Sequence, residues 1–211
     1  MQRYQLLTQN EIEQIHENSL RIMENIGIHM TYQPAKDLLA KGGAKVDGDT
    51  VYFPKKMVED NLKTVPSSFT MYARNPEKNV YIDTETTAYV GPYGSPFVTD
   101  MDKGRRRGTL EDFNNIVKIC DVLNNIDIQS HISCEPNDVE VSKRPNTMVY
   151  NTMKYSEKPL MGSVFGYETS RQCIELASIP FGGLSAIKEK PVISSIPCTL
   201  TPLSYDDNML G

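Results

Sequence analysis

The sequence predicts an α/β fold in which the second half of the chain builds parallel β-α-β units. Short apolar segments at 126–132, 159–164 and 191–197 alternate with helical stretches at 145–155 and 168–179. The chain has 211 residues, and its 39% hydrophobic and 23% charged residues are typical of a globular protein, not of a disordered or fibrous one. Strands that alternate with helices run parallel in a barrel or in a doubly wound sheet, and the pattern leaves both arrangements open.

The first 65 residues predict three helices and one hairpin. Thr8 and Glu11 have the spacing of a capping box, and Gly27 is a plausible C-terminal stop for the helix that follows. The predicted apolar face of this helix consists of Ile12, Ile15, Ser19, Ile22, Met23 and Ile26. The other elements are a helix from Pro34 to Gly42 that buries Ala35, Leu38 and Leu39, a hairpin at 44–53 around Asp47-Gly48, and a helix from Pro54 that ends before Pro66.

The middle of the chain predicts an antiparallel ribbon or small sheet over 67–107. Its strand-like pieces lie at 69–73, 79–82, 87–91 and 96–100. A helix capped by Thr109 follows, with Asp112 at its third position, and its apolar face consists of Phe113, Ile116, Val117, Ile119, Cys120 and Leu123. A last helix begins near 205–206. We therefore predict a helical and β-ribbon region at 1–108 and strand-helix units at 109–211.

Charge and cysteine content exclude several classes of protein. The net charge of -5 argues against a nucleic-acid scaffold, and the one dense basic run, Lys103 with Arg105 to Arg107, is interpreted as a solvated hairpin edge. The four cysteines form no C-x-x-C pair, which argues against a disulfide framework or a zinc ribbon. The chain shows no signal-peptide pattern, no membrane-length apolar run and no phosphate-binding loop, so we expect a cytoplasmic protein without membrane or nucleic-acid partners.

Six segments of the sequence carry a resemblance to a known family. They lie at 7–28, 44–54, 69–80, 108–127, 157–166 and 201–210, and their specific phrases are Tyr72 to Pro76, Gly91 to Pro96, Thr109 to Asp112 and Lys158 to Gly162. In this order and without large gaps, they resemble the trimethylamine methyltransferase (MttB) family. The resemblance implies a TIM (β/α)8 barrel, of which this chain would be the N-terminal part, since family members are about twice as long and the missing part would include the position that is pyrrolysine in archaeal members.

The resemblance also implies an activity and a partner. Such enzymes move a methyl group from a methylated amine to the cobalt of a corrinoid (cobalamin) held by a separate protein, so no cofactor is expected on this chain itself. Trimethylamine and quaternary amines such as glycine betaine both remain open as substrates. Because cobalt is the nucleophile, the protein needs no general base, and no catalytic residue is assigned. We also expect a homo-oligomer.

In a barrel, the chemistry takes place at the carboxyl ends of the strands. This rule indicates the loops at 131–138, 162–167 and 197–205. The Gly-Pro-Tyr-Gly turn that contains Tyr93 is expected to fold over the mouth of the barrel. A quaternary ammonium has no hydrogen to donate, so aromatic faces recognise it. The candidate substrate-binding residues are Tyr93, His131, Phe165, Tyr167 and Thr199. Local packing or hydrogen bonding of the same aromatic residues is the alternative.

His131, Cys134 and Glu135 place three potential metal ligands on one loop. Their spacing matches no common zinc pattern, so we predict no metal site. His131 is then either a contact to substrate or corrinoid, or an ordinary hydrogen-bonded histidine. Two other functions remain open, namely a non-catalytic interaction fragment and a metal-dependent α/β barrel enzyme that uses His131 and Cys134.

Overall fold

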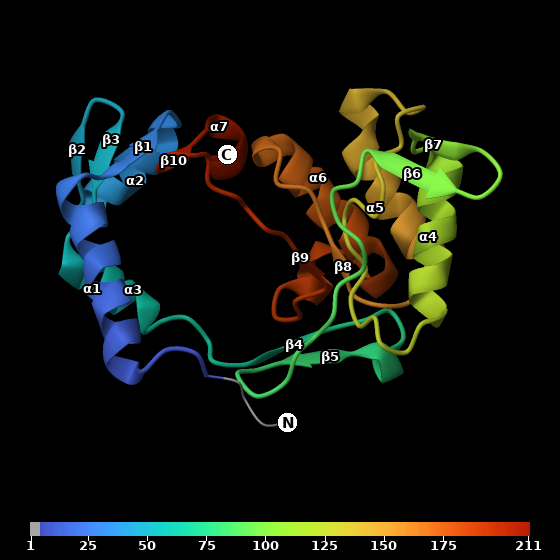
Figure 1. Cartoon of the computed structure of the whole chain (residues 1–211), viewed down its shortest axis with the longest axis horizontal. Coiled ribbons are helices and arrows are strands. Elements are labelled where there is room, and N and C mark those ends of the chain that lie inside the picture. Colours follow the sequence, from blue (N-terminus) through green and yellow to red (C-terminus); the bar gives the residue numbers. More distant parts are fainter. Residues whose placement is uncertain (1–4) are drawn as a thin grey trace. The chain divides into compact units, whose positions relative to one another are not determined.

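A computed structural model describes residues 5–211 and contains two compact units, which are described separately (Figure 1). Unit 1 comprises the described residues up to Val65 together with Cys198–Gly211, and unit 2 comprises Pro66–Pro197. The boundary predicted at residue 108 separates a helical and β-ribbon region from strand-helix units. The two compact units do not test this boundary, so it stays a prediction.

Unit 1 is a four-stranded mixed sheet with helices packed on it. Its elements are α1 (Gln9–Asn25), β1 (Ile28–Met30), α2 (Gln33–Lys41), β2 (Lys45–Asp47), β3 (Thr50–Tyr52), α3 (Lys55–Leu62), β10 (Ser204–Tyr205) and α7 (Asp207–Leu210). The strand order is β10-β1-β3-β2, with β1 antiparallel to β3 and parallel to β10. The predicted hairpin is confirmed as β2–β3, whereas β1 and its pairing with β10 were not predicted.

The two ends of α1 are formed as predicted. The Glu11 N–H donates to Thr8 Oγ1 at 3.3 Å, and the Thr8 N–H donates to Glu11 Oε2 at 2.7 Å, which completes the capping box. Gly27 ends the helix with a φ of 79°, and a Cβ at this position would lie 2.7 Å from Thr50 Cγ2. Both backbone conformation and space therefore require glycine at this position.

The buried faces of α1 and α2 differ from the prediction. In α1, Ile15 is 54% exposed and Leu20 is buried. In α2, Leu38 is 71% exposed, and the buried residue is Lys36, whose ammonium donates to Asp49 at 2.6 Å. The aliphatic stem of a lysine packs like an apolar side chain when its charged end reaches a carboxylate, and hydrophobic periodicity does not register this.

Unit 2 contains short strands and three longer helices. Its elements are β4 (Phe69–Met71), a 3-10 turn (Pro76–Lys78), β5 (Val80–Ile82), β6 (Phe97–Asp100), β7 (Gly104–Arg107), α4 (Leu110–Val122), a 3-10 turn (Val141–Lys143), α5 (Arg144–Tyr155), β8 (Leu160–Met161), α6 (Gly166–Ser178), 3-10 turns at Ile179–Phe181 and Leu184–Ile187, and β9 (Ile193–Ser194). β4 pairs antiparallel with β5, and β6 pairs antiparallel with β7.

Four segments of unit 2 run parallel and lie side by side in chain order. Val90 bridges to Ile128, Gln129 bridges to Leu160, and β8 pairs with β9. The helices α4, α5 and α6 lie between successive segments in the sequence, as in β-α-β units. The prediction that 87–91 is an antiparallel strand is wrong, because Val90 is a parallel neighbour of Ile128.

Polar groups fasten these segments to the helices. The Lys158 ammonium, which is buried, donates to the carbonyls of Cys120, Leu123 and Ile126 at 2.6–2.8 Å. These carbonyls lie at and just beyond the C-terminal end of α4, where a cation is favoured by the unpaired acceptors and by the helix dipole. The predicted apolar face of α4 is correct at Phe113 and Val117, which are buried, and wrong at Ile119, which is 56% exposed.

The α/β class is confirmed by the mixture of helices, antiparallel hairpins and parallel segments (Figure 1). None of the sheets in residues 5–211 closes on itself. The structure therefore does not show a barrel, and the partial TIM barrel stays a prediction.

Candidate functional site

The loops at the carboxyl ends of the parallel segments are joined by backbone hydrogen bonds. The Gly91 N–H donates to the Ile128 carbonyl at 3.1 Å, and the Gly94 N–H donates to the Ile132 carbonyl at 2.9 Å. The Glu135 N–H donates to the Ser95 carbonyl at 2.8 Å. These bonds fix the turn that contains Tyr93 against the loop that follows Ile128.

A cavity of about 500 Å³ opens at this end of the parallel segments. It is lined by Gly94, Ile132, Glu135, Val141, Ser142, Arg144, Pro145, Met148, Phe165 and Thr169. Its volume lies within the roughly 300–1,000 Å³ range of small-molecule sites. The lining is mostly apolar, with one carboxylate, one guanidinium and one aromatic ring, which is the composition of a pocket that orients a small charged ligand.

The structure brings only part of the predicted site together. Phe165 lines the cavity and is 50% exposed, so its ring is available to a ligand. Tyr93 and Tyr167 are 51% and 67% exposed and are not part of the cavity lining. Thr199 is an exposed residue of unit 1, where it lines an apolar cavity of about 480 Å³ with Phe53 and Tyr205.

Glu135 and Arg144 form the charged part of the cavity. Arg144 Nη1 donates to Glu135 Oε1 at 2.6 Å, and Arg144 Nε donates to the Val139 carbonyl at 2.8 Å. The side chain of Arg144 is 15% exposed and that of Glu135 is 39% exposed. Sequence analysis did not identify Arg144 as a site residue. Its only local signal is its place directly before Pro145, in the first turn of α5.

His131 directly precedes Ile132, which lines the cavity, and it is 2% exposed. Neither of its ring nitrogens has a hydrogen-bond partner within residues 5–211. Burial lowers the pKa of His131 to about 4, because desolvation penalises the charged imidazolium. At neutral pH the ring is therefore uncharged, and the prediction of an ordinary hydrogen-bonded histidine does not match its surroundings.

The structure gives no support to a metal site at His131, Cys134 and Glu135. Burial raises the pKa of Cys134 to about 11, so the thiol is protonated at neutral pH in this structure. Glu135 is already paired with Arg144. Across the described part of the chain, no three His, Cys, Asp or Glu side chains form a group that could hold a metal ion.

Comparison with known proteins places the chain in a family. The family model described as trimethylamine methyltransferase (MTTB) matches residues 1–211. This chain belongs to the trimethylamine methyltransferase family.

Three relatives show how this family member compares with named enzymes. Glycine betaine methyltransferase of Desulfitobacterium hafniense strain Y51 is 41% identical over 209 residues, which cover 99% of this chain and 44% of the relative. Trimethylamine methyltransferase MttB of Desulfitobacterium hafniense strain DCB-2 is 26% identical, covering 92% of this chain and 39% of the relative. Proline betaine:corrinoid methyltransferase of Eubacterium limosum is 25% identical, covering 95% and 44%. The chain spans less than half the length of these relatives.

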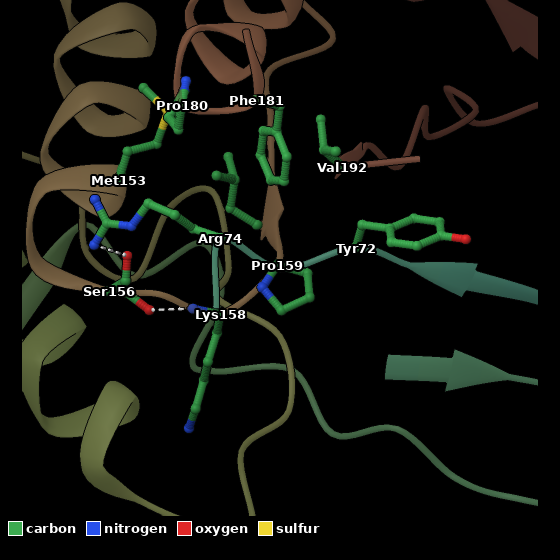
Figure 2. A pocket seen from close by; sticks show the side chains of 10 residues that line it. Tyr72, Arg74, Met153, Ser156, Lys158, Pro159, Pro180, Phe181 and Val192 are labelled. Atoms are coloured by element: carbon green, nitrogen blue, oxygen red, sulfur yellow. Dashed lines mark hydrogen bonds between the residues drawn. The ribbon is translucent and has the colours of Figure 1, made fainter. Parts of the chain in front are cut away.

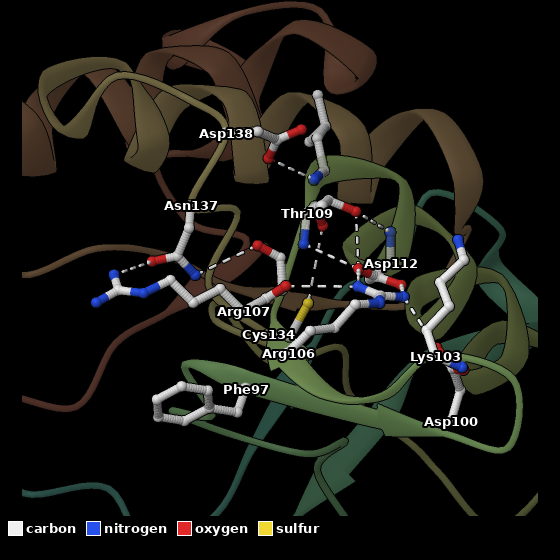
Figure 3. Close-up of polar contacts among 12 residues, drawn as sticks. Phe97, Asp100, Lys103, Arg106, Arg107, Thr109, Asp112, Cys134, Asn137 and Asp138 are labelled. Atoms are coloured by element: carbon white, nitrogen blue, oxygen red, sulfur yellow. Dashed lines mark hydrogen bonds and ion pairs between the residues drawn. The ribbon is translucent and has the colours of Figure 1, made fainter.

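In this member of the trimethylamine methyltransferase family, the basic run forms strand β7 of a hairpin (Figure 3). Arg106 is not a solvated cation, because it makes ion pairs with Asp100 and Asp112 and so connects the hairpin to the first turn of α4. The guanidinium holds the pKa of the Asp112 carboxyl well below its usual range. Arg105 stacks on Phe97 at 3.9 Å, and Arg107 donates to Asn137 at 3.3 Å. The interpretation as a solvated edge is therefore correct only in part.

A third, much smaller cavity lies at the amino end of β8 (Figure 2). Its volume is about 10 Å³, and its lining includes Tyr72, Arg74 and Ser156. Arg74 Nη2 donates to the Ser156 carbonyl at 3.2 Å. This space holds about one water molecule, so it does not accommodate a methylated amine.

No helix within residues 5–211 combines the length and the apolar character that a membrane crossing requires.

Proposed function

We propose that this chain is part of a methyltransferase that moves a methyl group from a tertiary or quaternary methylamine to the cobalt of a corrinoid held by a partner protein. The observation that supports this proposal most strongly is the family match over residues 1–211. Two relatives support the choice of acceptor, because their names, proline betaine:corrinoid methyltransferase and L-carnitine:corrinoid methyltransferase, state it for those proteins.

We further propose that the four parallel segments of unit 2 are the first strands of a TIM barrel. Their order along the sheet follows the sequence, and a helix lies between each pair, as in the first units of such a barrel. The cavity beside Phe165 lies at the carboxyl ends of these segments, which is the catalytic face of a barrel.

In the proposed reaction, reduced cobalt supplies the electron pair that forms the new bond to the methyl carbon. The C–N bond of a quaternary ammonium, or of a tertiary amine that carries a proton, breaks, and the electron pair of this bond leaves with the neutral amine. No protein base is required, so the residues of this chain orient the amine and exclude water. Phe165 would face the ammonium, since a cation over an aromatic ring gains about 0.5–2 kcal/mol when desolvated. The other candidate substrate-binding residues stay predictions, namely Tyr93, His131, Tyr167 and Thr199.

The test is methyl transfer by the full-length enzyme that contains this chain. The enzyme is mixed with its corrinoid partner in the Co(I) form and, separately, with trimethylamine, glycine betaine, proline betaine or carnitine, and methylcobalt formation is followed by absorbance. Reactions without enzyme and with a monomethylamine serve as controls. We expect methylcobalt with at least one tertiary or quaternary amine, and its absence with all of them would contradict the proposal.

A further inference from the structure

The Glu135–Arg144 pair gives the cavity both signs of charge. The two groups are in contact, with Arg144 Nη1 donating to Glu135 Oε1 at 2.6 Å, and both residues line the cavity with Phe165. Both charged groups therefore border a cavity of about 500 Å³. In a ligand that carries both charges, the anion can pair with Arg144 and the cation can pair with Glu135.

Each member of the pair has hydrogen-bonding capacity left over. A guanidinium has five N–H groups, and Arg144 uses three of them, toward Val139, Glu135 and Asn137. The Asn137 contact is long, at 3.5 Å. Within the described residues, Oε2 of Glu135 has no hydrogen-bond partner. The guanidinium can therefore donate two more bonds to an anion while the carboxylate remains available to a cation.

We infer that Arg144 and Glu135 are specificity-determining residues that select a zwitterionic betaine, which has a quaternary ammonium and a carboxylate, over an amine without a carboxylate. The inference rests on the proposed methyl transfer. The carboxylate of the betaine accepts hydrogen bonds from the free N–H groups of Arg144, an arrangement that arginine favours through its planar fork. The ammonium lies between Glu135 and the exposed ring of Phe165.

The geometry also explains why an amine without a carboxylate binds less well. Trimethylamine and choline place no anion at Arg144, so the arginine stays paired with Glu135 and neutralises the charge that would attract the ammonium. A betaine supplies a carboxylate to Arg144 and so leaves more of the Glu135 charge for its own ammonium. The discrimination comes from charge pairing and requires no difference in size.

The experiment measures glycine betaine and choline on the full-length enzyme, with titration calorimetry for affinity and methyl transfer for kcat and KM. For Arg144→Met we expect at least about tenfold weaker affinity for glycine betaine and a matching rise in KM, whereas choline affinity should rise or stay the same, because Glu135 loses the partner that neutralises its charge. For Glu135→Gln we expect weaker binding of both ligands. Arg144→Lys keeps a cation and should restore part of the betaine affinity.

Controls separate this role from folding. Arg171→Met removes an arginine of α6 that pairs with Glu168 and Glu175 outside the cavity lining, and it should leave betaine affinity unchanged. Calorimetry reports inactive protein as a reduced stoichiometry, so a variant that folds incompletely still gives its affinity. Equal losses for betaine and choline in Arg144→Met, or no loss for betaine, would overturn the inference.

The outcomes also separate this inference from the proposed function. An enzyme that transfers methyl groups from trimethylamine but does not bind glycine betaine retains the proposed function and disproves the role of Arg144. An enzyme that methylates cobalt from no amine disproves the proposed function itself.

Discussion

At the scale of single residues, Lys158 is a buried charge that connects two elements. Its ammonium donates to three carbonyls at the end of α4, and the residue is buried. Lys158 and Pro159 directly precede β8, so the Lys158 side chain connects a helix end to the start of a parallel segment. The contacts of Lys158 are all local to unit 2, and we expect its removal to act on stability and not on ligand affinity.

Lys158→Met keeps the length of the side chain and removes its charge. We expect the free energy of unfolding to fall by about 3 kcal/mol, because buried carbonyls that lose a charged donor are costly to leave unpaired. Urea denaturation followed by circular dichroism measures the change. Lys188→Met, at an exposed lysine, is the matched control and should change stability little. Equal effects of the two substitutions would show that the hydrogen bonds of Lys158 to the three carbonyls contribute nothing specific to stability.

His131 predicts a pH dependence of stability. Burial lowers its folded-state pKa to about 4 from an ordinary value of 6.5, so the unfolded chain binds the proton first as pH falls. The stability associated with the neutral ring is present above pH 6.5 and is lost as pH falls toward 4, with at most about 3 kcal/mol lost in total.

Denaturation of His131→Leu at pH 7.5, 6, 5 and 4.5 checks this dependence. The difference in unfolding free energy between wild type and variant should shift in favour of the variant as pH falls. Carboxylates titrate in both proteins and cancel in this difference. His16→Gln, at an exposed residue of α1, is the matched control for a histidine substitution. A pH-independent difference for His131→Leu would mean that the ring is not held neutral.

At the scale of elements, the β6–β7 hairpin depends on Arg106 for its attachment to α4. Arg106→Met removes the ion pairs to Asp100 and Asp112 and leaves the hairpin held by its strand pairing. We expect amide hydrogen exchange in residues 97–107 to become about tenfold faster, since local opening then costs less free energy. Mass spectrometry measures this rate.

The exposed turn residue Lys103 provides the control for this measurement. It is exposed and lies in the same hairpin, so Lys103→Met changes the charge by the same amount without removing the ion pairs of Arg106. Exchange in residues 97–107 should remain at the wild-type rate. Faster exchange in both variants would assign the effect to net charge and not to the attachment.

Local sequence signals predicted the ends of elements better than their faces. The capping boxes at Thr8 and Thr109 are formed as expected, because they depend only on residues three positions apart. The burial of Lys36 and the exposure of Leu38 depend on Asp49, which comes from a different element. The parallel pairing of Val90 with Ile128 likewise depends on a contact between distant residues.

The candidate site shows the same limit. Phe165 was predicted from its place after a strand, and it lines the cavity. The pairing of Glu135 with Arg144 joins a loop to the first turn of α5, and no local pattern in the sequence indicates it. Tyr167 satisfied the same positional rule as Phe165 without lining the cavity, because that rule fixes a loop and not the direction of a side chain. Tyr93, which was predicted from a turn expected over the barrel mouth, does not line the cavity either.

At the scale of the whole molecule, the two units should unfold as separate transitions. The sheet of unit 1 needs β10, and its apolar core includes Tyr205 and Leu210. A chain that ends at residue 197 should therefore lose the transition of unit 1 and keep that of unit 2 at its wild-type temperature. Differential scanning calorimetry measures both.

A chain that ends at residue 206 is the intermediate case, because it retains β10 and lacks α7. We expect it to keep a unit 1 transition at a lowered temperature. A single transition that shifts as a whole in both truncated chains would show that the units are not independent. Light scattering on the same samples tests the predicted homo-oligomer. A monomer that unfolds cooperatively would favour an interaction module that acts alone, whereas aggregation would indicate a part of a larger enzyme.

The place of β10 next to β1 sets an order of events on the ribosome. β1 is made early, but its parallel partner at Ser204–Tyr205 emerges about 140 residues after Val65. At about 5–20 residues per second, this delay is on the order of ten seconds. Throughout that time one edge of the nascent sheet is open to other chains, which is the interval in which a chaperone would be needed. Unit 2 is continuous in sequence, and all of its residues are made before β10.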